Sequence, residues 1–157
     1  MKNMKKAEAR IRAGEANIGV FYKKRIKLPY DVRRCAAGIL KSEGAERSGL
    51  NIVFVGDGFI KRMNSEYRGK NRATDVITFQ NSGKGGDIYI SVDTAKRNAR
   101  EFGVPVFEEV SRLVIHGVLH SLGYVHTNSR DERKMKSKAA KYMRYFKNAP
   151  AEAGNAE

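Results

Sequence analysis

The sequence predicts an α+β fold in which helices pack on a small mixed sheet of about four strands. Short β-branched runs alternate along the chain with longer segments whose apolar residues recur at helical spacing. One of these segments, 106–122, is apolar nearly all round, so its helix is expected to be buried. A length of 157 residues, 41% of them hydrophobic, corresponds to one globular domain with a sizeable core.

Four runs are expected to form the strands. Residues 17–26 alternate well enough for a strand, and their lysines place it at an edge of the sheet. Residues 50–56 are a β-branched run too short for a helix, which predicts a central strand. Residues 74–80 and 87–91 are the remaining strands, with a glycine-containing turn between them at 81–86.

Helix boundaries follow from capping residues and glycines. Asp57 is suited to cap the second helix, and Ser91 or Asp93 is suited to cap the third. Gly44 ends the first helix, and Gly103 ends the third. The predicted helices are 31–43, one that starts at Asp57 and ends before a polar loop at 67–73, one that ends at Phe102, 106–122, and 129–146.

The two ends of the chain differ in composition from its centre. Residues 1–16 are predicted to be a basic extension, 17–147 the folded domain, and 148–157 a disordered tail. The N-terminal residues lack the apolar core of a signal peptide, and no window approaches the ~18 apolar residues of a spanning helix. A single cysteine, Cys35, cannot form an internal disulfide. We expect a cytoplasmic protein without a membrane partner.

Charge indicates the kind of partner. Lys and Arg number 31 against 17 Asp and Glu, a net charge of +14. A surplus of this size on a small protein favours a polyanion such as nucleic acid over a merely solvated surface.

The most specific signal is the stretch HGVLHSLGYVH at 116–126, which contains all 3 histidines of the chain. His116 and His120 are spaced i and i+4, so their imidazoles share one face of the buried helix, ~6 Å apart along its axis. Gly123 can end the helix, and His126 can then return as a third ligand. Three nitrogen ligands with an open fourth position are typical of a catalytic zinc site, so we predict one Zn²⁺ per chain.

The stretch matches the zinc signature of the metzincin proteases, except that Gly117 replaces their catalytic glutamate. A metal by itself lowers the pKa of bound water to about 7, so a phosphodiester can be attacked without that base. We therefore interpret Gly117 as evidence against a peptidase and as a residue that leaves room for a bulky substrate.

Three blocks together resemble one family. The histidine stretch is similar to the H-G-x-L-H-x-x-G-Y-D-H signature of the YbeY family, bacterial metal-dependent endoribonucleases of rRNA maturation. MNSEYRGKNRATDVITFQ at 63–80 and GDIYIS at 86–91 resemble two further blocks of that family, in the same order. The resemblance covers roughly 17–146. It implies a zinc site made by His116, His120 and His126.

The resemblance also implies Arg68 as the residue required for RNA cleavage, single-stranded rRNA ends as substrate, and the small ribosomal subunit with its assembly factors as partners. Val125 departs from the pattern, because the family usually has Asp there, and a carboxylate near the metal is lost. Asn71, Ala73 and Gln80 replace an Asp and two prolines, and the proline losses are expected to loosen the loop.

Several basic residues are candidate RNA contacts. Arg68 has a planar fork that can hold two phosphate oxygens. It shares its loop with Lys70 and Arg72, and the C-terminal helix carries Lys134, Lys138 and Lys141 on one side. The alternative to RNA contact, for each group, is an ordinary solvated basic surface.

Taken together, these features predict a zinc-dependent, single-strand-specific endoribonuclease in 16S rRNA 3′-end maturation and ribosome quality control. Two alternatives stay open: a ribosome assembly factor whose metal is only structural, and a metal-dependent peptidase. An open coordination position favours catalysis, and a fourth protein ligand favours a structural metal.

Overall fold

In the computed structural model, residues 17–81, 85–125 and 127–148 are described here. The elements, in chain order, are β1 (Asn17–Tyr22), α2 (Val32–Ser42), β2 (Gly49–Val55), α3 (Asp57–Arg68), β3 (Val76–Gln80), β4 (Gly85–Ser91), α4 (Val92–Phe102), α5 (Val106–Ser121) and α6 (Ser129–Asn148). The predicted extension 1–16 and most of the predicted tail, 149–157, lie outside the described residues, and α6 reaches Asn148.

The four strands form one mixed sheet in the order β1-β2-β4-β3. β1, β2 and β4 run parallel, whereas β3 pairs antiparallel with β4 at the edge. The predicted α+β fold with a small mixed four-stranded sheet is therefore confirmed. The edge position of the first strand and the central position of the second are confirmed as well.

The first strand is shorter than predicted. Residues 23–26 leave the sheet, because the N–H groups of Lys23 and Lys24 both donate to the carbonyl of Phe54, at 2.9 and 3.2 Å. Two donors on one carbonyl bend the chain instead of continuing the ladder.

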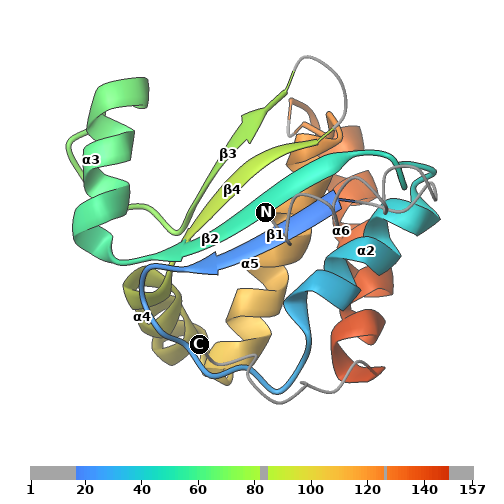
Figure 1. Ribbon diagram of the computed structural model, residues 1–157, viewed down its shortest axis with the longest axis horizontal. Coiled ribbons are helices and arrows are strands. Elements are labelled where there is room, and N and C mark those ends of the chain that lie inside the picture. Colours follow the sequence, from blue (N-terminus) through green and yellow to red (C-terminus); the bar gives the residue numbers. More distant parts are fainter. Residues whose placement is uncertain (1–16, 82–84, 126, 149–157) are drawn as a thin grey trace, which may run out of the picture.

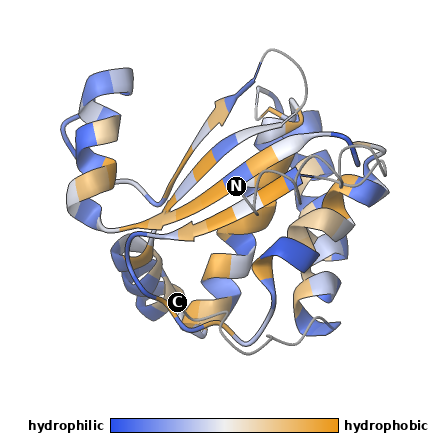
Figure 2. Ribbon diagram, viewed as in Figure 1, coloured by the Kyte–Doolittle hydropathy of each residue, from blue (hydrophilic) through white to orange (hydrophobic). Residues whose placement is uncertain are grey.

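The sheet has two unlike faces (Figure 1). Helices α2, α4, α5 and α6 lie on one side, and α3 lies on the other. On the covered side, alternate strand residues such as Ile52, Ile88 and Ile90 are fully buried in the main core. Hydrophobic residues are concentrated along the strands and the adjacent helices in Figure 2. The open side has only a small cluster under α3, made of Val53, Val55, Ile60 and Ile77.

The helix α5 crosses the covered side beneath β4 and β3, as the apolar pattern of 106–122 predicts. Its start is held by a polar network in which Arg112 pairs with Glu109 at 2.7 Å and with Asp75 at 3.5 Å. Asn98 of α4 donates to both carboxylates, at 2.9 Å to Glu109 and 3.3 Å to Asp75. Because Asp75 directly precedes β3, this network fixes α5 against the edge strand.

Among the helices of the described ranges, none is long and apolar enough to span a bilayer.

Candidate functional site

A groove of about 360 Å³ runs along the free edge of β3. The C-terminal end of α3 lies along one wall of this groove, and α5 with the turn after it forms another. Its lining residues are Tyr67, Arg68, Val76, Ile77, Thr78, Phe79, Gln80, His116, His120, Tyr124 and Val125. The groove therefore joins the two sequence blocks that carry the predicted arginine and the predicted histidines.

The two helical histidines lie side by side in this groove. The ring centroids of His116 and His120 are 4.3 Å apart, with the ring planes inclined by 55°. Both side chains are half-buried, on a helix whose other faces are packed in the core. This is the geometry that the i, i+4 spacing predicts. His126, the predicted third ligand, lies outside the described residues.

Arg68 reaches the groove because α3 ends there. It is the last residue of the helix, and Gly69 follows in the left-handed conformation with φ 66°. The Lys70 N–H donates to the carbonyl of Asn64 at 3.1 Å, and the Asn64 amide donates to the carbonyl of Arg72 at 2.9 Å. The buried Asn64 thus holds both ends of the following loop. Arg68 at a helix C-terminus also complements the helix dipole.

The predicted RNA contacts Lys70 and Arg72 are exposed on this loop and do not line the groove. They flank Arg68 without facing the histidines. A role in holding the RNA backbone outside the groove stays a prediction for both residues.

Gly117 has a different role from the one we predicted. A Cβ atom at this position would lie 2.5 Å from Cγ2 of Ile88 on β4. Ile88 is fully buried, and a β-branched side chain is restricted at χ1, so its Cγ2 methyl group cannot easily rotate away. The interpretation that Gly117 leaves room for substrate is therefore wrong: the glycine lets α5 pack closely on the sheet, and the space beside it is filled.

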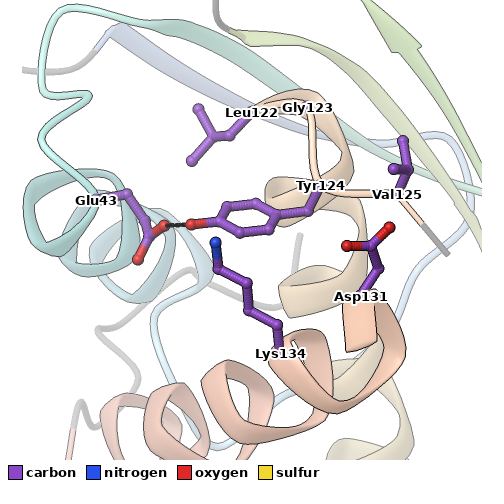
Figure 3. Close-up of a pocket in the computed structure, with 7 residues that line it drawn as sticks. All are labelled: Glu43, Leu122, Gly123, Tyr124, Val125, Asp131 and Lys134. Atoms are coloured by element: carbon purple, nitrogen blue, oxygen red, sulfur yellow. Dashed lines mark hydrogen bonds between the residues drawn. The ribbon is translucent and has the colours of Figure 1, made fainter. Parts of the chain in front are cut away.

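Glu43 anchors the turn that follows α5. The Tyr124 hydroxyl donates to the Glu43 carboxylate at 2.5 Å (Figure 3). The Lys138 ammonium pairs with the same carboxylate at 2.9 Å. The Tyr142 hydroxyl is a third donor. Burial raises the pKa of the Glu43 carboxyl, whose side chain is only 8% exposed, but the three donors outweigh burial and lower it.

This anchor lies beside a second hollow of about 320 Å³, lined by Glu43, Leu122, Gly123, Tyr124, Val125, Asp131 and Lys134. Tyr124 and Val125 line both hollows, so the turn is the wall between them. The groove at β3 is lined by the two histidines and Arg68. The second hollow is lined by Glu43, the residue that anchors the turn.

The three lysines of the C-terminal helix that were predicted to bind RNA make different contacts. Lys138 is paired with Glu43, so it contributes to the anchor instead of to a free basic surface. Lys134 lies over the Tyr124 ring at 5.5 Å, and Lys141 lies over the Tyr142 ring at 5.4 Å. Both remain largely exposed, and RNA contact stays a prediction for these two.

The residues present fit a metal ion with nitrogen ligands. Two imidazoles one turn apart can approach a single ion, and the lining residues include no carboxylate that would favour a hard cation. Within the part of the chain that the structure describes, no group of three histidine, cysteine or acidic residues is close enough to hold a metal. The third ligand predicted from the sequence, His126, lies outside these residues and stays a prediction.

Some of the groove residues could not be selected from the sequence. Tyr67, Thr78 and Phe79 line it, yet the sequence pattern places Tyr67 only in a polar loop and the other two only in a strand. Gln80 ends β3 and lines the groove too, so the expected loosening of a loop does not apply at that position. Glu43 is 81 positions from Tyr124, and no local pattern connects the two residues.

Fold and groove together define a class of protein: a small α+β domain with paired histidines on a buried helix and an arginine facing the same groove. Comparison with known proteins specifies it further. The family model described as Endoribonuclease YbeY matches residues 21–147. The chain belongs to this family.

Individual relatives agree. The chain is 42% identical over 119 residues to the Endoribonuclease YbeY of Anaeromyxobacter sp. (strain Fw109-5), a match that covers 72% of this chain and 62% of that protein. It is 36% identical over 113 residues to the Endoribonuclease YbeY of Flavobacterium psychrophilum, covering 70% and 81%. The solution structure of TM1509 from Thermotoga maritima superimposes with a TM-score of 0.67 and 30% identity, covering 83% of this chain and 89% of that one.

Proposed function

We propose that this protein is a zinc-dependent endoribonuclease that cuts single-stranded RNA in 16S rRNA 3′-end maturation and ribosome quality control. The observation that carries the proposal is that Arg68 lines the same groove as His116 and His120. Family membership supports the reaction class, because the matching relatives are named endoribonucleases.

The histidines supply the place for the metal. His116, His120 and His126 would hold the zinc ion, which when bound supplies a Lewis acid and lowers the pKa of a bound water to about 7. The imidazoles are oriented by a helix whose close packing depends on Gly117, so little rearrangement is required on binding. The Glu43 anchor holds the turn that leads to His126.

Arg68 supplies the charge for the phosphate. Its guanidinium can donate two hydrogen bonds to the phosphodiester and neutralise the negative charge that develops in the transition state. The described groove residues contain no carboxylate that would repel the RNA. Arg68 is therefore a catalytic residue in this proposal, and Tyr67 beside it contacts the substrate.

The remaining features concern the substrate and its location. A net charge of +14 suits an RNA backbone, and the small ribosomal subunit with its assembly factors supplies such RNA. Both partners, and a cytoplasmic location, are parts of the proposal.

The test compares cleavage of a single-stranded and a duplex RNA, with zinc-loaded and chelator-treated protein and with the variants Arg68→Ala and Arg68→Lys. Loss of one transition-state donor costs on the order of 10²–10³ in rate, so Arg68→Ala should retain its zinc and most of its RNA binding while cleavage collapses. Arg68→Lys should restore little, since a point charge cannot replace the two-pronged donor.

Arg100→Ala is the matched control, because Arg100 also lies in the last turn of a helix that ends at a left-handed glycine, Gly103 with φ 66°. It should cut RNA normally. His120→Ala should lose its zinc, as measured by elemental analysis. Cleavage that persists unchanged in Arg68→Ala at equal zinc content would contradict the proposal and favour an assembly factor with a structural metal.

A further inference from the structure

The open face of the sheet carries a row of apolar side chains that crosses all four strands. In the strand register Phe21 pairs with Val53, Val53 with Tyr89, and Tyr89 with Ile77. Because side chains alternate between the faces, these four point to the same side of the sheet. The row starts at the β1 edge and ends at β3, which borders the histidine groove.

Aromatic rings continue this row up to the groove. Phe59 of α3 stacks with Tyr89 at a centroid distance of 6.1 Å, and Tyr89 meets Phe79 at 6.0 Å. Phe79 in turn meets Tyr67 at 5.3 Å, and these last two rings line the groove beside Arg68. We define Phe21, Phe59, Tyr89, Phe79 and Tyr67 as the aromatic row.

The two ends of the row are open to solvent. Phe21 is 53% exposed and Tyr67 is 65% exposed. Phe21 does not belong to the small hydrophobic cluster under α3, so it is not required to complete that cluster. Together with the other rings of the aromatic row, this exposed residue forms an apolar surface of the kind that can take a ligand.

The ring of Phe21 is held flat against its own strand. A Cβ atom at Gly19 would lie 2.7 Å from Cε2 and 2.9 Å from Cζ of that ring, and 2.7 Å from Oδ1 of Asn51 on β2. The missing side chain at Gly19 is therefore what lets the ring lie over the backbone, with its other face turned outward. Together with Val20, Tyr22, Lys23, Val53, Phe59 and Tyr89, the ring lines a hollow of about 640 Å³.

Positive charge accompanies the rings. The Lys23 ammonium lies 5.4 Å from the centroid of Phe59, and the Arg62 guanidinium lies 5.9 Å from it. On the same face, the Asp87 carboxylate accepts a hydrogen bond from the Asn51 amide at 3.0 Å. Between residues 57 and 72, the basic side chains Lys61, Arg62, Arg68, Lys70 and Arg72 outnumber the acidic ones Asp57 and Glu66.

We propose that the aromatic row is a binding track for single-stranded RNA that leads into the histidine groove. Bases stack on the exposed rings at its ends, Phe21 and Tyr67, and phosphates are held by Lys23, Arg62 and Arg68. Exposed rings interleaved with cations are how proteins hold unpaired nucleotides without reading their sequence. A duplex hides the faces of its bases, so the track selects single strands. The track deepens the proposed function and rests on it for the identity of the RNA.

The chain contains 0 tryptophans, so one introduced at a chosen position is a unique fluorescent reporter. Phe21→Trp places the indole on the track, and stacking by a base quenches its fluorescence. The matched control is Phe102→Trp on α4: Phe102 is 56% exposed and has the Arg112 guanidinium 6.0 Å from its centroid, but it lies on the covered side of the sheet. The ligand is a single-stranded 2′-O-methyl oligonucleotide, which cannot be cut by attack of its own 2′-hydroxyl, with an abasic oligomer of equal length beside it.

The oligonucleotide should quench Phe21→Trp, the abasic oligomer should not, and Phe102→Trp should respond to neither. Phe21→Ala should weaken oligonucleotide binding roughly 5- to 150-fold, the effect of one lost stacked base. Equal quenching at both tryptophans, or none at residue 21, would overturn the track and leave the open face to a protein partner.

These experiments distinguish failure of the RNA track from failure of the proposed nuclease function. Base-dependent quenching in a protein that leaves unmodified RNA intact would reject the nuclease and retain the track. Normal cleavage with an unchanged KM in Phe21→Ala would reject the track and retain the nuclease.

Discussion

The covered and open faces of the sheet are made by the same four strands, yet they do different work. On β4, Ile88 and Ile90 point into the main core, while the alternate residue Tyr89 points to the open face. Helices α2, α4, α5 and α6 shield the first set, whereas α3 covers only part of the second (Figure 1). The difference teaches that the covered face carries most of the buried core, whereas the partly uncovered face keeps exposed the aromatic residues on which the proposed RNA track depends.

The largest expected effect on stability comes from the covered face. Ile90→Ala should lower the free energy of unfolding by about 2–5 kcal/mol, because it leaves a cavity in a fully buried site. Phe21→Ala on the open face should change it by less than about 1 kcal/mol, since that ring is half exposed. Urea unfolding measures both. A cost at Phe21 as large as that at Ile90 would remove the distinction between the faces.

A smaller effect is expected where the helices meet the two faces. Gly117→Ala on α5 should destabilise the protein by about 1–3 kcal/mol, because the new methyl group overlaps Ile88. Gly58→Ala on α3 is the matched control. A Cβ atom there meets no other atom within 4 Å, so the better helix former should raise stability by up to about 1 kcal/mol. Effects of the same sign in thermal unfolding would contradict this comparison.

The smallest effect concerns the link between α3 and the covered side. Asp57 accepts hydrogen bonds from Ser91 and Thr94, each at 2.7 Å, and pairs with Arg97 of α4 at 2.7 Å. Burial raises the pKa of Asp57, but these donors outweigh it and lower the value from 3.8 to about 2. The carboxylate therefore stabilises the fold above pH 3.8, and this contribution is lost as the pH falls toward 2.

Because Asp57 is partly exposed, that loss should amount to at most about 2 kcal/mol. Stability curves of the wild type and Asp57→Asn should converge as the pH falls through this window. Curves that stay parallel between pH 5 and pH 2 would show that Asp57 does not carry the link.

The sequence by itself determined most of the local elements and the pairing of the two helical histidines. The helix cap at Ser91 acts as expected, since a side chain that caps its own helix needs only its near neighbours. The predicted cap at Asp57 was wrong, because Gly56 is the N-cap residue of α3 and the Asp57 carboxylate binds Ser91 and Thr94 instead. The pairing of His116 with His120 was predictable for the same reason, because a helix repeats every 3.6 residues whatever surrounds it. The resemblance to a known family, read from three short blocks, was confirmed by the family match.

Tertiary structure alone decided what lies next to what. The groove brings Arg68 to the histidines only because α3 ends beside the β3 edge, and this depends on strand order instead of local spacing. The reason for Gly117 was hidden because Ile88, the residue that excludes a side chain there, comes from another element. The aromatic row combines rings from β1, β3, β4 and α3, so no single segment contains it. Contacts between distant segments depend on how the layers pack, and a one-dimensional pattern does not contain that information.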